Sequence, residues 1–548
     1  MKINVRTEMN KIYKIESKGG NLLSILQDHK VEISNLCQGN GTCGKCKVKV
    51  LKGNLPITES DRTCLTKKEL EQGIRLACKA VISENEILLS DSEILEIEIL
   101  ASSDENILVE SISVSRETQE NVTEDAEYFL AIDIGTTTIA MVLIKSDTKE
   151  ICDVYTSLNH QRKYGADIIS RIVAANEGKS EELKKLIEED LQRGIIKLTK
   201  EGSIPVSHII IAGNTTMIHL LMGYDCQTLG KFPFYSEHLE QIECLLKECI
   251  TTKERCDKEE DGISKKRKAL FVENNVFENL KNIPVTIFPG ISAFVGGDVV
   301  ADIITCQEFE TEELTLLIDL GTNGEMVLGN KDKLLVTSTA AGPAFEGGNI
   351  SCGTASIPGS ICRVKIQNHK AIVKTIKDQL PPVGICGTGL ISAIAQLKQN
   401  KLIDTQGKLN FPYSEKGYSL WSFESGEKMI LSQKDIREFQ MAKAAIRAGI
   451  EILMKEFGCK EHEIQKIYIA GGFGKALVIE DTIITGMLPE IFRGRIHTIG
   501  NGALKGAVCL GKGSVSKEQM NRIRERSKNI SLSQKTEFQK KYLEYMLL

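Results

Sequence analysis

The chain is poor in aromatic residues and lacks any long apolar run. Aromatic side chains make up 5% of its 548 residues, and Trp421 is the single tryptophan. Proteins that bind single-stranded nucleic acid stack bases on exposed aromatic side chains beside basic groups, whereas this chain has a net charge of −5. No uncharged apolar run reaches the roughly 18 residues of a membrane span, and the N-terminal MKINVRTEMNKIYKIESKGG has no apolar signal-peptide core. We therefore expect a cytoplasmic protein with no nucleic-acid partner and no membrane partner.

A Walker-type nucleotide site and a disulfide framework are also excluded. The sequence contains no G-x4-GK[ST] segment. It contains 16 cysteines, but the cytosol keeps thiols reduced, so disulfides do not explain them. Many of these cysteines are isolated and are interpreted as small buried apolar residues. The cysteines near the N-terminus alone are dense enough to form a convincing site, and the length of the chain predicts two to four structural units.

The N-terminal region has the element order of a β-grasp ferredoxin. Residues 2–18 alternate apolar and polar side chains, which predicts two strands, and NLLSILQDH then places apolar residues at helical spacing. A loop rich in glycine and asparagine follows, SNLCQGNGTCGKC, and CKVKVLKG leaves it as a strand. A last strand is expected after Cys78. The order strand, strand, helix, loop, strand predicts an α+β domain at residues 1–92.

Four cysteines of this region form the expected metal centre. Cys37, Cys43 and Cys46 have C-x5-C-x2-C spacing in the glycine-rich loop, and Cys78 follows after a further segment. A [2Fe-2S] cluster needs four thiolates, two on each iron, and the glycines let backbone N–H groups turn toward the sulfurs. Zinc ribbons pair two C-x2-C hairpins, and redox pairs lack the upstream Cys37, so both alternatives fit less well. Cys64 competes for the fourth position, and the LACKAV context favours Cys78.

Composition divides the rest of the chain. Acidic residues dominate 84–127, while apolar residues still alternate in EILEIEIL and ILVESISVS, so short strands are expected within a small linker at 93–127. After Tyr128, apolar strands punctuated by glycine alternate with helices, which predicts an α/β region with buried strands. We place its first part at 128–295 and its C-terminal part at 296–548.

A charged segment at 236–281 interrupts the first part of this α/β region. It lacks a core-forming period and is interpreted as an exposed insertion. It holds Cys244, Cys249, Cys256 and His238, so a metal site there is an alternative, although no familiar ligand spacing supports it.

Two strand-to-turn segments predict a site for a nucleotide. AIDIGTTTIA and LLIDLGTNGEM each end a buried strand on an aspartate and continue into a glycine turn, and IYIAGGFGKA closes a third strand on two glycines. Tight glycine turns let backbone N–H groups and threonine hydroxyls approach phosphate oxygens, and strand-end aspartates can hold Mg²⁺ through its waters. We expect Asp133 and Asp319 to be the catalytic carboxylates. The expected ATP-binding residues are Gly135, Thr136, Thr137, Thr138, Gly321, Thr322, Asn323, Gly324, Gly471 and Gly472.

Four further glycine segments have two interpretations. They are GNTT at 213–216, GGD at 296–298, CGTG at 386–389 and NGALKGA at 501–507. They either line the nucleotide cleft or form packing corners between helices and strands.

The order of the three turn segments resembles the phosphate-1, phosphate-2 and adenosine segments of the acetate and sugar kinase, heat-shock chaperone and actin superfamily. The resemblance covers roughly residues 128–548 and implies two ribonuclease-H-like lobes that close on ATP. The whole chain resembles the reductive activators of corrinoid proteins. Matching segments are CQGNGTCGKC, LACKAV, AIDIGTTT, GADIISRI, AGNTTM, LLIDLGTNGEM, AGPAFEG and IAGGFG, in this order, whereas 236–281 has no match.

This resemblance implies an ATP-dependent one-electron reduction of Co(II) to Co(I) in the corrinoid protein of a methyltransferase system. The implied cofactors are a [2Fe-2S] cluster, ATP and Mg²⁺, and the implied electron donor is a low-potential ferredoxin or a flavin reductase. The electron transfer is expected to be uphill even for a cluster near about −400 mV. Each roughly 59 mV of one-electron deficit lowers the equilibrium constant by a factor of ten. ATP would then act through conformation. Whether the chain forms a homodimer stays open.

Two other functions fit the same domains. One is an ATP-driven activator of another low-potential enzyme, such as those that serve 2-hydroxyacyl-CoA dehydratases, although these hold a [4Fe-4S] cluster between subunits and lack a ferredoxin module. The other is an actin-like kinase or ATPase with a structural or sensing cluster. Cluster type distinguishes the redox alternatives, and phosphorylation of a small molecule would indicate a kinase.

Overall fold

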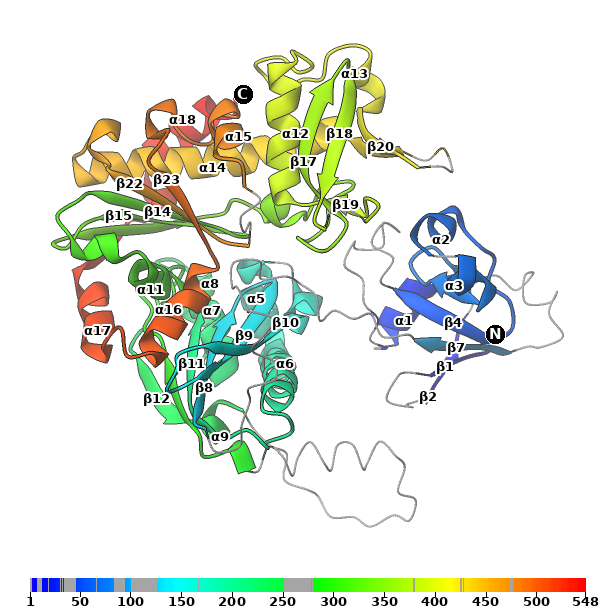
Figure 1. Ribbon diagram of the computed structural model, residues 1–548, viewed down its shortest axis with the longest axis horizontal. Helices are drawn as coiled ribbons and strands as arrows, with labels where there is room; N and C mark the ends of the chain where they lie inside the picture. Colours follow the sequence, from blue (N-terminus) through cyan, green and yellow to red (C-terminus); the bar gives the residue numbers. More distant parts are fainter. Residues whose placement is uncertain are drawn as a thin grey trace.

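The structure is a computed structural model in which the chain forms three main β-sheets (Figure 1). We call them the N-terminal, middle and C-terminal sheets. The described residues are 2–6, 12–17, 19–29, 31, 33, 46–65, 67–82, 94–99, 126–165, 167–250, 277, 279–377, 380–423, 426, 428–472 and 477–548.

The N-terminal sheet has five strands in the order β2-β1-β7-β4-β5. Its apolar residues alternate with polar ones, so that Ile3 and Val5 of β1 and Leu95 and Ile97 of β7 are fully buried on one face. Helix α1 (Leu22–Asp28) packs its leucines into the same core. The strands and remaining elements are β1 (Lys2–Arg6), β2 (Ile12–Glu16), β4 (Lys47–Lys52), α2 (Glu59–Cys64), α3 (Lys67–Glu71), β5 (Ile74–Leu76) and β7 (Ile94–Ile99), with a separate pair, β3 (Gly20–Asn21) and β6 (Val81–Ile82).

Strand β7 corrects the expected boundary of the first domain. The sequence placed residues 94–99 in the linker that was drawn from residue 93. The strand itself was expected, but it pairs in parallel with β1 and antiparallel with β4, at the centre of the N-terminal sheet. The alternation of ILEIEI shows that one face is buried, yet it does not show against which core. Of the rest of the expected linker, residues 100–125 lie outside the described residues.

The middle and C-terminal sheets share five strands of their topology. In each, an antiparallel three-stranded meander is extended by two parallel strands on one side. The sixth strand differs: in the middle sheet it is antiparallel and lies beyond the parallel strands, and in the C-terminal sheet it is parallel and lies beside the meander. The middle sheet runs β10 (Ile151–Leu158), β9 (Thr138–Lys145), β8 (Tyr128–Ile134), β11 (Val206–Gly213), β13 (Pro284–Ile287) and β12 (Ile242–Leu245). The C-terminal sheet runs β23 (Ile496–Gly500), β22 (Lys466–Ala470), β14 (Thr315–Leu320), β15 (Gly324–Gly329), β16 (Leu334–Thr339) and β24 (Ser527–Asn529). The repeated topology agrees with the two-lobed, ribonuclease-H-like fold expected from the sequence.

Helices α11 (Gly297–Thr305) and α16 (Gly502–Gly511) lie between these two sheets (Figure 1). One continuous apolar core joins Phe129 of the middle sheet, Leu317 of the C-terminal sheet, Val299 of α11 and Leu504 of α16. Small residues permit the close packing. A Cβ at Gly506 would lie 2.1 Å from the backbone oxygen of Ala301. The two lobes are therefore joined through a shared helical layer.

The outer faces of both sheets carry further helices. Helices α5 (Ile168–Ala174), α6 (Ser180–Leu198) and α7 (Thr215–Met222) belong to the core of the middle sheet. The 25-residue α14 (Gln433–Phe457) packs on the C-terminal sheet and is capped at both ends, by the Ser432 hydroxyl, which accepts from the Asp435 N–H, and by Gly458 with φ 87°. A smaller layer contains α12 (Gly387–Gln399), β17 (Ser360–Gln367), β18 (Lys370–Thr375), β19 (Gly384–Ile385), β20 (Tyr418–Ser422) and β21 (Lys428–Leu431), and α17 (Lys517–Arg526) and α18 (Thr536–Glu544) lie near the C-terminus.

The segment 236–281 is not simply an exposed insertion. Its start supplies edge strand β12 and the short α9 (Leu246–Cys249), whose Leu246 and Cys249 are fully buried in the middle core, and Phe277 is buried near its end. The charged residues around these buried positions hid them in the sequence. Within the described part of the segment, the Sγ atoms of Cys244 and Cys249 lie 3.1 Å apart. The third cysteine considered there, Cys256, lies outside the described residues.

None of the helices in the described ranges is both long enough and apolar enough to cross a lipid bilayer.

Candidate functional site

Two of the four predicted cluster ligands meet beside the N-terminal sheet. Cys46 lies immediately before β4 and Cys78 in the turn after β5, and both are buried. The backbone N–H of Cys78 donates to the Sγ of Cys46 over 3.5 Å. N–H donors to sulfur are the contacts that tune iron–sulfur ligands. Cys37 and Cys43, predicted as the other two ligands, lie outside the described residues.

The neighbourhood of Cys78 is held by Asp61 of α2. The Asp61 carboxylate accepts from the backbone N–H of Leu76 over 2.7 Å, and it also closes the capping box of α2 with Thr58. This buried carboxylate therefore fixes the strand that leads into Cys78. Cys64, considered as the competing ligand, ends α2 and is partly buried.

The first predicted phosphate turn joins β8 to β9. The Gly135 N–H donates to the Thr138 oxygen over 3.0 Å, and a Cβ at Gly135 would approach that oxygen to 2.7 Å, so the turn requires glycine. Two side chains hold the turn from outside. Asn159 Nδ2 donates to the Gly135 oxygen over 2.9 Å, and the fully buried Arg171 donates to the Thr136 oxygen over 2.5 Å. Arg171 belongs to the GADIISRI segment, and its role was not foreseen from the sequence.

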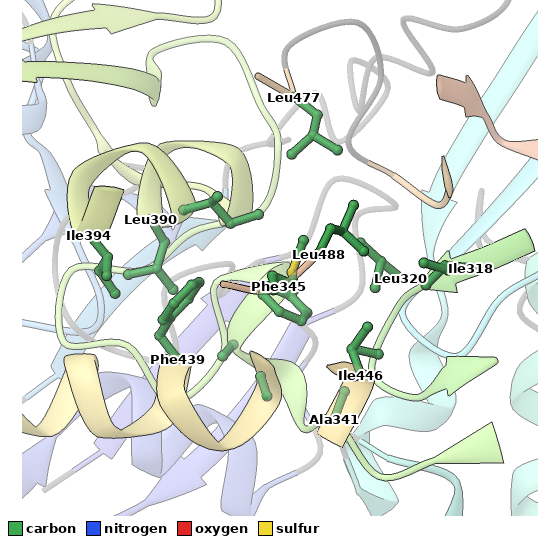
Figure 2. Packing of buried hydrophobic residues seen from close by; sticks show 14 of the residues in the cluster. Ile318, Leu320, Ala341, Phe345, Leu390, Ile394, Phe439, Ile446, Leu477 and Leu488 are labelled. Carbon is green, nitrogen blue, oxygen red and sulfur yellow. The ribbon is translucent and has the colours of Figure 1, made fainter. Parts of the chain in front are cut away.

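The second predicted phosphate turn joins β14 to β15 in the corresponding place of the C-terminal sheet. The Gly321 N–H donates to the Asn323 oxygen over 2.9 Å. A Cβ at Gly324 would lie 2.1 Å from Cδ1 of Ile446, so α14 packs directly against the turn. Figure 2 shows Ile446 beside Ile318 and Leu320 of β14. The same helix thus supports the strand and the turn that follows it.

The two predicted catalytic aspartates lie one residue before the ends of β8 and β14, in one cluster of buried and partly buried carboxyls. Asn501 Nδ2 donates to Asp133 Oδ2 over 2.7 Å. Burial raises the pKa of Asp133 to about 7 despite this bond, and Asp298 and Asp319 add to the effect. Burial likewise raises the pKa of Asp298 to about 7 and that of Asp319 to about 6. Each carboxyl is thus destabilised in its charged form where no cation compensates it.

Asp302 and Glu325 complete the cluster. No N–H or O–H of the described residues reaches either carboxyl oxygen of Asp302. Burial raises the pKa of Asp302 well above its ordinary value, and the charges of the neighbouring Asp319 and Asp298 carboxyls raise it further. Burial and the charges of Asp298 and Asp319 also raise the pKa of Glu325. A divalent cation would stabilise the charged forms of these carboxyls.

The described side chains do not form a ready-made metal cage. In the ranges that the structure covers, no three His, Cys, Asp or Glu residues are arranged to hold one ion.

The third predicted segment reaches the same cluster. Gly471 follows β22 with φ 112°, and a Cβ there would lie 2.4 Å from the Leu320 oxygen and 3.2 Å from Asp319 Oδ1. Gly472 faces open space. Gly471 was expected near the adenosine, and the structure places it against the carboxylate at the second phosphate turn.

The four additional glycine segments all take part in close packing. A Cβ at Gly296 of GGD would lie 2.4 Å from the Thr215 nitrogen of GNTT, and one at Gly389 of CGTG would lie 2.1 Å from the Ile361 oxygen, as would one at Gly506 of NGALKGA from the Ala301 oxygen. GGD and NGALKGA supply Asp298 and Asn501 to the carboxyl cluster. The sequence pointed to these segments through their glycines, but the side chains that reach the carboxyl cluster are their polar neighbours.

Comparisons with known proteins match three consecutive parts of the chain. Residues 8–83 match the 2Fe-2S iron-sulfur cluster binding domain, 128–257 the RACo middle region, and 313–548 the C-terminal domain of RACo, the ASKHA domain. A corrinoid activation enzyme, RamQ of Eubacterium limosum, is 33% identical over 412 residues, which are 71% of this chain and 64% of the relative. The chain thus spans just under two thirds of that relative's length.

Two further similar proteins are matched over a larger share of their own length. The [Co(II) methylated amine-specific corrinoid protein] reductase of Methanosarcina barkeri is 25% identical over 69% of this chain and 68% of its own length. A solved structure of a reductive activator for corrinoid, iron-sulfur protein is 26% identical, covers 100% of this chain and 98% of its own, and has a TM-score of 0.68.

Proposed function

We propose that this chain, which matches RACo domains over residues 128–257 and 313–548, reductively activates a corrinoid protein of a methyltransferase system in an ATP-dependent reaction. The electron passes to Co(II) and restores Co(I), and a low-potential ferredoxin or a flavin reductase supplies it. The observation that carries the proposal is the combination, in one chain, of a buried cysteine pair beside a ferredoxin-like sheet with two glycine turns on one carboxyl cluster.

The cysteine thiolates would hold the iron–sulfur cluster. Cys46 and Cys78 supply two ligands, and the Cys78 N–H directed at the Cys46 sulfur stabilises negative charge on that sulfur. Cys37 and Cys43 are the proposed remaining ligands. When bound, the [2Fe-2S] cluster supplies a one-electron reductant.

The turns would bind ATP between the two lobes. Backbone N–H groups and hydroxyls of 135–138 and 321–324 approach the phosphates, and Asp133 and Asp319 face the metal that accompanies them. Mg²⁺ when bound neutralises phosphate charge. Because the turns belong to different sheets, a nucleotide that touches both would favour one relative position of the lobes, and this can make partner binding depend on ATP.

The test follows cobalt directly. The full chain is reduced chemically under anaerobic conditions and mixed with a corrinoid protein in the Co(II) state, and the Co(I) absorbance is recorded with ATP, with a non-hydrolysable analogue and without nucleotide. Of the three samples, we expect complete conversion to Co(I) only in the one that contains ATP. Equal conversion without nucleotide would refute the ATP requirement, and ATP-dependent phosphorylation of a small molecule without Co(I) would favour a kinase.

Asp319→Ala separates the two halves of the proposal. Removal of this carboxylate should abolish ATP hydrolysis and Co(I) formation while the visible spectrum of the cluster stays intact. Asp332→Ala is the matched control, because Asp332 is exposed in the turn between β15 and β16. Unchanged hydrolysis in Asp319→Ala would contradict the proposed site.

A further inference from the structure

One carboxylate touches both phosphate turns and was not assigned from the sequence. Glu346 ends the single-turn helix η6 (Pro343–Glu346) in the AGPAFEG segment. It accepts a hydrogen bond from the hydroxyl of Thr322 in the second turn and one from the hydroxyl of Thr137 in the first. Glu346 therefore lies where the middle and C-terminal lobes face each other across the proposed phosphate site.

The backbone around Glu346 is fixed by its neighbours. The buried ring of Phe345 packs edge-to-face on Phe439 of α14, with ring centroids 6.1 Å apart (Figure 2). Gly347 follows with φ 79°, and a Cβ there would lie 2.3 Å from the Thr354 oxygen. The carboxylate is thus presented by a backbone that tolerates little change, as a group that positions a reactant requires.

The charge around Glu346 differs from that around the aspartates. Burial raises the pKa of the Glu346 carboxyl, and the guanidinium groups of Arg171 and Arg162 act in the opposite direction. Burial and neighbouring carboxyls raise the pKa values of Asp133, Asp298 and Asp319, and the charge of Glu346 contributes to the shift of Asp319. One side of the site therefore suits a cation, and the other presents hydroxyls and arginines with a single carboxylate between them.

On the basis of the proposed ATPase function, we propose that Glu346 orients and deprotonates the water that attacks the terminal phosphorus of ATP. The water oxygen forms a bond to the γ-phosphorus as the bond from that phosphorus to the β–γ bridging oxygen breaks. The water proton passes to the Glu346 carboxylate, and ADP leaves with the electron pair of the broken bond. The proton returns to solvent as inorganic phosphate departs.

The geometry favours Glu346 over the aspartates for this role. A general base must lie within hydrogen-bond reach of the proton that it takes, and the terminal phosphate is expected between the two turns that Glu346 bridges. Asp133 and Asp319 lie near the ends of the strands beneath the turns and share their surroundings with further carboxyls. A carboxylate that already accepts from two hydroxyls can exchange one of these bonds for a water.

The experiment compares Glu346→Gln with the wild type in the full, cluster-containing chain. Glutamine keeps the size of the side chain but cannot take the proton. We expect the affinity for a fluorescent ATP analogue to stay within about threefold, and the rate constant of ATP hydrolysis to fall about 100-fold or more, the usual contribution of a general base. Glu415→Gln, at an exposed position of α13 (Tyr413–Lys416), should change neither value.

The outcomes separate this inference from the ATPase function itself. Normal hydrolysis by Glu346→Gln overturns the inference and leaves the ATPase function intact, whereas a wild type without hydrolysis overturns the function. Loss of analogue binding in Glu346→Gln would overturn the inference by assigning Glu346 to nucleotide binding. If Glu346→Gln does not fold, Glu346→Ala with added formate is the second test. Formate should restore the rate constant without changing KM, and no recovery would overturn the inference.

Discussion

Lys443 offers a quantitative test of the packing around α14. This lysine lies in the middle of the helix with 2% of its surface exposed, and its Nζ donates to the backbone oxygens of Thr485, over 3.3 Å, and of Leu547. Burial, with smaller contributions from Lys398 and Arg447, lowers its pKa from 10.5 to about 7. The folded chain therefore releases this proton at a lower pH than the unfolded chain does.

The sign of the resulting pH dependence follows from proton counting. Between pH 7 and pH 10.5 the unfolded chain holds a proton that the folded chain has released, so the free energy of unfolding rises with pH. The rise is about 1.4 kcal/mol per pH unit and amounts to roughly 4 kcal/mol over the interval. Below pH 7 both states are protonated, and Lys443 contributes no further change.

Lys443→Met removes the amine and keeps most of the apolar stem. The variant loses hydrogen bonds worth about 1 kcal/mol each. At neutral pH it also loses the unfavourable free energy of burying, or deprotonating, the amine in the folded chain. We expect it to be more stable than the wild type at pH 7, with the difference shrinking by roughly 3 kcal/mol by pH 9.5.

The measurement is urea unfolding at several pH values, followed by the fluorescence of Trp421, the single tryptophan. Titration of all other groups is common to both proteins and cancels in the difference. Lys434→Met, at an exposed position of the same helix, is the control and should stay parallel to the wild type. A difference between Lys443→Met and the wild type that does not change with pH would refute the reasoning.

Three further predictions concern the sites and the domain boundary. Gly471→Ala should lower the free energy of unfolding by about 1–3 kcal/mol, because its Cβ would lie 2.4 Å from the Leu320 oxygen. Gly472→Ala should change the free energy of unfolding by no more than about 0.5 kcal/mol. Equal effects of the two substitutions in urea unfolding would contradict the geometry. Cys78→Ala should abolish or severely perturb the visible absorption of the [2Fe-2S] cluster and Cys64→Ala should not, and the reverse result would exchange the two assignments. A fragment of residues 1–125 should fold and retain the cluster. The fragment 1–92 should do neither, because it lacks β7 from the centre of the N-terminal sheet. A stable cluster in the fragment 1–92 would show that β7 is dispensable.

The sequence predicted those parts of the fold that depend on local pattern. Alternation indicated β1 and β7, long apolar strands ending on Asp133 and Asp319 indicated the two lobes, and glycine spacing indicated both turns. These signals persist because a strand end and its turn are close in the chain.

Features that depend on long-range packing could not be predicted in the same way. The alternation of β7 shows a buried face but not the sheet to which the strand belongs, so its assignment to the linker was wrong. Asp302 lies within an ordinary apolar helix, and its burial beside Asp319 follows only from the packing of α11 between the sheets. Glu346 lay in a segment noticed for its resemblance, yet only the folded chain brings it to both turns.

The central position of β7 has a mechanical consequence. It is the last described strand of the N-terminal sheet, and β8, the next described strand, carries Asp133 of the proposed nucleotide site. Because β7 is paired along both edges, a force applied at its C-terminal end would load its hydrogen bonds to β1 and β4 together. A strand at the edge of the sheet, with one partner, would resist the same force with a single row of bonds.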